Sequence, residues 1–155
     1  MPTLDASLHR LGLQLPTTPQ PLANYLPAVA VHSGTTAYVS GQLPLKDGKL
    51  IATGSVPREV SPEQATECAR QCVLNAIAAL ATTIPDLDRV RGVARIAGYV
   101  NAEPGFAEHP AIINGASDLI VELLGDAGKH ARAAIGVASL PMNAPVEIEV
   151  TFIVD

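Results

Sequence analysis

Alternation of apolar and polar residues predicts two strands at the C-terminal end of the sequence. Residues 146–154 alternate, with Val146 and Ile148 on one face and Glu147 and Glu149 on the other, which is the period-2 pattern of a strand. A second run covers residues 132–138. The prolines between the two runs cannot donate to a strand ladder and belong in the connection. The pattern favours an antiparallel hairpin.

Two segments have apolar residues at helical spacing. The first begins at Ser61-Pro62-Glu63-Gln64, where Ser61 can cap, Pro62 suits the first helical position and Gln64 completes a capping box. Its apolar face runs to Leu80, and the helix is expected to end near Thr83. The second helix is expected over residues 107–124, where Gly125 is a natural stop.

The other elements complete a single α+β domain over residues 1–155. Strands are predicted at 28–32, 36–40 and 90–101, a turn at 46–49 and a loop at 51–60. Residues 1–27 are expected to be an irregular extension, because Pro16, Pro19, Pro21 and Pro27 interrupt it, with a short strand at 11–15. The simplest way for both helices to bury their apolar faces is to pack on one face of a mixed sheet.

The amino-acid composition and charge of the chain make some classes of function less plausible than others. The chain has 155 residues, of which 48% are hydrophobic, 16% charged and 3% aromatic, and its net charge is -5. These values are typical of a globular protein. The lack of a Lys/Arg cluster argues against nucleic acid as a partner. Cys68 and Cys72, four residues apart on one helix face, are expected to pack as small apolar residues rather than hold a metal.

The cellular location of the protein can be predicted from its N-terminal sequence and from the lengths of its apolar runs. Residues 1–15 lack a basic start followed by an apolar core, so no signal peptide is expected. No apolar run approaches the length needed to cross a membrane. We therefore expect a protein of the cytoplasm with no membrane partner.

Four short motifs occur in order along the chain. They are Tyr25 near the N-terminal strand, Ser40-Gly41-Gln42-Leu43-Pro44, Asn114 within Ile113-Asn114-Gly115, and Arg132 followed by Val137, Leu140-Pro141 and Val146-Glu147-Ile148-Glu149. Together they resemble the motifs of the Rid family (reactive intermediate deaminases, also called YjgF-like or endoribonuclease L-PSP-like proteins), in which the Asn opens the second helix. The similarity covers about residues 20–155, nearly one family domain. It implies the chorismate-mutase-like α+β fold and a homotrimer with clefts between subunits.

The resemblance also implies a reaction, the hydrolysis of a 2-aminoacrylate-type enamine or imine to a 2-keto acid and ammonia, without a cofactor or metal. The Arg132 guanidinium can hold the substrate carboxylate by two parallel hydrogen bonds. Glu147 can position or deprotonate the attacking water, and Ser40 can bond to substrate or water. Each residue also has a structural reading: Glu147 can simply line a polar sheet face, and Ser40-Gly41 can simply end a strand.

The remaining candidates are substrate-binding residues. The Gly41 backbone can approach a ligand closely because it lacks a Cβ atom. Tyr25 can close the cleft, or lie at an interface without contacting substrate. Asn114 can orient the guanidinium or the ligand, or be a polar residue of a helix terminus. His130 is either an extra proton carrier on the strand face of Arg132 or a loop histidine in solvent.

One position departs from the family pattern: many deaminating members have Cys two residues after the arginine, where this chain has Ala134. The loop that contains residues 58–60 and the extended N-terminus suggest a divergent subgroup. Two alternatives to the deaminase remain, a trimeric protein that binds small carboxylates without turnover and an endoribonuclease. The acidic balance and the scarcity of aromatic residues disfavour the endoribonuclease, since RNA needs phosphate neutralisation and stacking.

The expected hairpin separates Arg132 from Glu147. Arg132 would lie opposite residues near Phe152, five residues along the strand from Glu147, or roughly 17 Å. One chain could not then grip a small molecule with both side chains. We therefore expect Arg132 of one subunit to approach Glu147 of the next.

Overall fold

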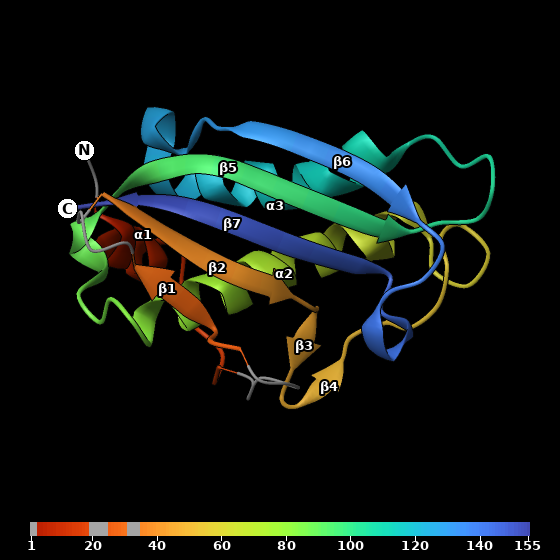
Figure 1. The fold of residues 1–155 in the computed structure, drawn as a ribbon, viewed down its shortest axis with the longest axis horizontal. Coiled ribbons are helices and arrows are strands. Elements are labelled where there is room, and N and C mark those ends of the chain that lie inside the picture. The colour runs from red at the N-terminus through yellow and green to blue at the C-terminus, as the bar shows by residue number, and fades with distance from the viewer. Residues whose placement is uncertain (1–2, 19–24, 31–34) are drawn as a thin grey trace.

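A five-stranded sheet covered on one face by two long helices organises the part of the chain that the structure describes (Figure 1). The structure is a computed structural model that describes residues 3–18, 25–30 and 35–155. The helices are α1 Leu4–Arg10, α2 Pro62–Ala81 and α3 His109–Leu124. The sheet contains β1 Ala28–Ala30, β2 Thr36–Gln42, β5 Val90–Asn101, β6 Ala131–Val137 and β7 Val146–Val154; β3 Leu45–Lys46 and β4 Lys49–Leu50 form a separate ribbon.

Most of the predicted helices and strands are confirmed. The sequence patterns that predict them each lie within a few neighbouring residues. Ser61 accepts from the Gln64 backbone N–H, and the Gln64 side chain accepts from the Ser61 backbone N–H, so the capping box that begins α2 is complete. Strand β5 has the predicted bounds, and α3 begins two residues later than expected. The end of the strand predicted at 28–32 falls on residues 31 and 32, which lie outside the described residues.

The predicted hairpin of the last two strands is wrong. The sheet order is β1-β2-β7-β5-β6, so β5 lies between β6 and β7 (Figure 1). Strand β6 runs parallel to β5, and β7 runs antiparallel to it. The end of β5 passes between the two, since Asn101 N donates to Pro145 O and Ala102 N donates to Val137 O. The reason is α3, which connects β5 to β6 and can pack back onto the sheet only as a parallel crossover.

The N-terminal prediction is also wrong. Residues 4–10 form helix α1, capped by the Thr3 hydroxyl, and residues 11–15 are not a strand. Leu4 and Leu8, one helical turn apart, are buried in the core. The prolines that indicated an irregular extension all follow this segment, so they do not oppose a helix there.

The core lies between the helices and the sheet. Its largest fully buried side chains include Phe152, Ile148 and Ile96 from the sheet, and Ile77 and Ile120 from the helices. Cys68 and Cys72 are buried free thiols, as expected. Burial raises the pKa of Cys68 to about 11 and that of Cys72 well above its usual value, so both stay protonated and pack as apolar groups.

No helix formed by the described residues lies on the second face of the sheet (Figure 1). Side chains that alternate with the core residues point to this open face. They include Val29, Tyr38, Ile135 and Ile153, each between 42% and 55% exposed. Among the described residues, none of the helices is both long and apolar enough to cross a lipid bilayer.

Candidate functional site

Glu147 lies on the open face of the sheet, against the backbone of Gly41. It alternates with the fully buried Val146 and Ile148, so its half-buried side chain points away from the helices. A Cβ atom placed on Gly41 would lie only 2.0 Å from Glu147 Oε1. The β2–β7 register is irregular between Val39 and Gln42, which brings this glycine under the carboxylate. Glycine therefore leaves the space that Glu147 occupies.

Ser40 ties the segment that carries Tyr25 to the same place. Its hydroxyl donates to Leu26 O at 2.6 Å, and its backbone N–H donates to Pro27 O at 3.0 Å. Tyr25 precedes Leu26 and is 46% exposed. Strand β2 continues to Gln42, so Ser40-Gly41 does not simply end the strand. We call Tyr25, Ser40, Gly41 and Glu147 the Glu147 cluster.

The electrostatic surroundings of Glu147 suit a base. Partial burial raises the pKa of Glu147, and the negative charge of Glu149 on the same face raises it further. Tyr99, from the neighbouring strand β5, donates its hydroxyl to Glu149 Oε2 at 3.4 Å. The carboxylate of Glu147 thus binds a proton more readily than an exposed glutamate does.

Arg132 lies on the other side of the sheet, at the edge strand β6, and is held by α3. Its Nη1 donates to Ser117 Oγ at 3.1 Å, and its Nη2 donates to Pro110 O at 3.2 Å. Asn114 lies between these two residues on the same face of α3, one turn after Pro110, and is exposed. It is an interior residue of the helix rather than a terminal one.

His130 joins the same group of side chains. Its Nε2 lies 3.0 Å from Ser117 Oγ, and its Nδ1 lies 2.6 Å from Gly128 O. The residue is half-buried, so the prediction of a loop histidine in solvent is wrong, while the shared strand face with Arg132 is confirmed. We call Asn114, Ser117, His130 and Arg132 the Arg132 cluster. Ser117 was not among the candidates from the sequence, although it follows Asn114 by three residues in the same helix.

The two clusters are far apart in one chain, for a reason other than the predicted hairpin. Arg132 pairs with Ile96, which pairs with Val150, whereas Glu147 pairs with Tyr99. The two residues are therefore two strand spacings, about 10 Å, and three residues, about another 10 Å, apart. They also lie on opposite faces of the sheet. One small molecule cannot contact both within a single chain.

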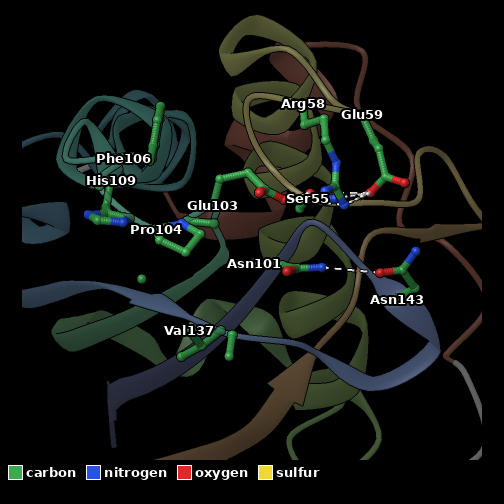
Figure 2. A pocket seen from close by; sticks show the side chains of 14 residues that line it. Ser55, Arg58, Glu59, Asn101, Glu103, Pro104, Phe106, His109, Val137 and Asn143 are labelled. Carbon is green, nitrogen blue, oxygen red and sulfur yellow. Dashed lines mark hydrogen bonds and ion pairs between the residues drawn. The ribbon is translucent and has the colours of Figure 1, made fainter.

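A cavity of about 570 Å³ lies beyond the carboxyl ends of β5 and β6 (Figure 2). It is lined by Ser55, Arg58, Glu59, Asn101, Ala102, Glu103, Pro104, Gly105, Phe106, His109, Gly136, Val137, Ala138 and Asn143. None of the candidate residues from the sequence lines it, apart from Arg58 and Glu59 of the loop noted there. It was missed because three segments distant in the sequence form it.

Most polar side chains of the cavity are bonded to one another, whereas His109 packs edge-on against the ring of Phe106 (Figure 2). Ser55 Oγ donates to Glu103 Oε1 at 2.5 Å, and Arg58 Nη2 lies 3.3 Å from the same oxygen. The Ser55 backbone N–H donates to Glu59 at 2.8 Å and lowers the pKa of that carboxyl. Asn101 Nδ2 donates to Asn143 Oδ1 at 3.2 Å. These bonds connect the loops that form the cavity.

No group of three or more His, Cys, Asp or Glu side chains in the described ranges could hold a metal ion. The two clusters provide a guanidinium on one face of the sheet and a carboxylate and a hydroxyl on the other.

Comparisons with known proteins give the family. A family profile described as "YjgF/chorismate mutase-like, putative endoribonuclease" matches residues 5–152. Protein TCP17 of Trypanosoma cruzi is 40% identical over 145 residues, which cover 93% of this chain and 89% of that protein.

Solved structures agree with the fold. Protein Atu1372 of Agrobacterium tumefaciens, a protein of unknown function, is 42% identical with a TM-score of 0.88, covering 98% of this chain and 92% of that one. A Shewanella oneidensis protein titled as a putative endoribonuclease is 32% identical with a TM-score of 0.92, covering 98% and 99%. The predicted chorismate-mutase-like α+β fold is confirmed.

Proposed function

Since the chain belongs to the YjgF/chorismate mutase-like family, we propose that it hydrolyses 2-aminoacrylate-type enamines and imines to 2-keto acids and ammonia, between subunits of a homotrimer. The observation that carries this proposal is the separation of the Arg132 and Glu147 clusters. Each cluster holds one part of the chemistry, and they lie on opposite faces of the sheet. A second copy of the chain would bring an Arg132 cluster to a Glu147 cluster.

Arg132 binds the substrate carboxylate in this proposal. A guanidinium has five N–H donors, and the described residues accept two of them, through Ser117 and Pro110. The three others are available for a carboxylate, which fits a planar guanidinium by two parallel bonds. Asn114, exposed beside the guanidinium, can bond to the same ligand.

Glu147 acts as the base in the hydrolysis. The enamine first takes a proton at its terminal carbon and becomes the imine. Glu147 then removes a proton from water as the water oxygen bonds to the carbon of the protonated imine, and it returns this proton to the nitrogen of the resulting carbinolamine. The C–N bond breaks as the hydroxyl proton of the carbinolamine passes to Glu147 and the carbonyl forms, which releases ammonia. The raised pKa of Glu147 suits a group that accepts and returns a proton. Ser40 donates to Leu26 O, so its oxygen still accepts a bond from water or the substrate nitrogen.

The open face of the sheet supports a subunit interface. Val29, Tyr38, Ile135 and Ile153 are exposed on it, and large apolar side chains gathered on one face typically mark a contact surface. Glu147 projects from this face, whereas Arg132 lies at the sheet edge that a neighbour could reach. A closed trimer would place the edge of one sheet near the open face of the next.

The experiment that tests the proposal is a coupled assay with Arg132→Ala. A PLP-dependent dehydratase generates 2-aminoacrylate or 2-iminobutyrate, and release of the 2-keto acid is measured with and without the protein. We expect acceleration by the wild type, and a KM about 10- to 100-fold higher for Arg132→Ala, because the variant loses charged hydrogen bonds to the carboxylate. Arg70→Ala, which removes a surface arginine paired with Glu122, is the matched control and should behave as wild type.

The outcomes separate the alternatives. If neither protein accelerates keto-acid release although pyruvate binds, the chain is a carboxylate-binding protein rather than a deaminase. If Arg132→Ala accelerates release as well as wild type, the activity resides elsewhere. An endoribonuclease would instead cleave RNA, and this cleavage should not depend on Arg132.

Gly41→Ala tests the contact beneath Glu147. The new methyl group would collide with Glu147 Oε1 and Cδ, so the carboxylate has to move. The colliding atoms end a flexible side chain, so we expect the melting temperature to change by at most about 4 °C. We expect kcat to fall by at least about tenfold, since the base is displaced. Unchanged kcat would show that Glu147 does not act from this position.

A further inference from the structure

We infer that Ser117 and His130 are positioning residues that fix the Arg132 guanidinium for carboxylate binding. This inference rests on the proposed function, in which Arg132 holds the substrate. It assigns roles to a serine that no sequence motif indicated and to a histidine whose role the sequence left open.

The direction of each hydrogen bond in this group follows from the partners at its two ends. Arginine only donates, so Arg132 Nη1 donates to Ser117 Oγ at 3.1 Å. A backbone carbonyl only accepts, so His130 Nδ1 donates to Gly128 O at 2.6 Å. In neutral His130 the other nitrogen, Nε2, then accepts from the Ser117 hydroxyl at 3.0 Å. The chain of bonds runs from Arg132 through Ser117 and His130 to the backbone.

This direction explains how the histidine acts on the arginine without touching it. A serine hydroxyl rotates freely, and its proton can point toward any acceptor nearby. His130 draws that proton to its own side, so a lone pair of Ser117 Oγ faces Arg132. Both His130 nitrogens are engaged, which favours a positioning role over the proton-carrier role.

Fixing the guanidinium matters because Arg132 is exposed on an edge strand. A long exposed arginine loses side-chain entropy when a ligand immobilises it. Two anchors on α3, at Ser117 and Pro110, impose that order before the ligand arrives. The carboxylate then meets an arginine already in place.

The test measures pyruvate binding by calorimetry and KM and kcat in the coupled assay. Ser117→Ala should raise the Kd for pyruvate by about tenfold, as expected for one bond to a charged group, and raise KM with kcat changed less than about twofold. Ser117→Thr keeps the hydroxyl and should restore the wild-type Kd. His130→Leu should resemble Ser117→Ala, whereas His130→Gln, whose amide oxygen can accept the serine proton, should stay within about threefold of wild type.

A double-mutant cycle separates this role from a general effect on the fold. Adding Ser117→Ala to Arg132→Ala should leave Kd unchanged, because the arginine on which it acts is gone. The inference is overturned if Arg132→Ala weakens binding while Ser117→Ala and His130→Leu do not, or if Ser117→Ala weakens binding equally in the Arg132→Ala background. If Arg132→Ala itself leaves Kd and KM unchanged, the proposed function fails first.

Discussion

Replacing Glu147 with glutamine should lower kcat by about 10²- to 10⁴-fold, the range typical of a lost general base. Glutamine keeps the size and polarity of the side chain but cannot take a proton from water. Pyruvate binds through Arg132 in the proposed cleft, so its Kd should stay within about threefold of wild type. Glu149→Gln is the matched control, since Glu149 is the exposed neighbour on the same strand face, and kcat should fall far less.

The pH profile gives an independent check on this glutamate. Burial and then Glu149 raise the pKa of Glu147 above 4.5. Because the base has to be ionised, the wild-type rate should fall as the pH decreases through that raised pKa. The residual activity of Glu147→Gln should lack this acid limb.

The stability of the folded state should depend on pH in the opposite direction to the rate, since ionisation of Glu147 destabilises the fold. Below pH 4.5 Glu147 is protonated in both the folded and unfolded states and burial of its charge costs nothing. As the pH rises, the unfolded chain ionises first, so the folded state loses stability until the pH passes the raised pKa. Glu147→Gln should therefore be more stable than wild type at neutral pH, and the difference should vanish below pH 4.5. A difference that grows on acidification would contradict the raised pKa.

Mixed oligomers would show whether the two clusters act across subunits. Arg132→Ala and Glu147→Gln chains, each expected to have much lower activity alone at a substrate concentration below KM, would be co-expressed with different tags. If each cleft takes Arg132 from one subunit and Glu147 from the next, random mixing leaves about a quarter of the clefts with both residues. We expect about that share of wild-type activity. No recovery would place both residues in the cleft of a single chain, which the sheet geometry opposes.

Gly115→Ala should reduce the free energy of unfolding by about 2–3 kcal/mol. A Cβ atom on Gly115 would lie 2.2 Å from the backbone oxygen of Thr66, so the close contact between α3 and α2 leaves no room for it. Backbone atoms cannot rotate away as a side chain can, so the helices would have to separate. Alanine would stabilise a helix at an unhindered position, which makes the expected loss diagnostic.

Urea unfolding at one fixed protein concentration measures this change. Asp118→Ala is the control, because Asp118 is an exposed residue of the same helix and gains helix propensity without a collision. It should change the free energy of unfolding by less than about 0.5 kcal/mol in the destabilising direction. Equal effects of the two substitutions would mean that the helices do not meet at Gly115.

Some candidate residues belong to a short sequence motif, and others are recognised only from their contacts in the folded chain. Arg132, Glu147, Ser40 and Gly41 were found in the sequence because each belongs to a short motif on a recognisable strand. Ser117 was not, since a single serine among the polar residues of an amphipathic helix has no pattern of its own. Its importance depends on Arg132 and His130, which follow it by 15 and 13 residues and meet it only in the folded chain.

The sequence by itself determined the elements whose causes lie within a few residues. The capping box at Ser61, the alternation of Val146–Val154 and the long apolar strand Val90–Asn101 each predicted an observed element. Only the tertiary structure decided that β5 separates β6 from β7, so that Arg132 and Glu147 lie two strands and three residues apart. Strand pairing depends on where α3 packs, and the free energy of that packing comes from contacts between segments far apart in the chain.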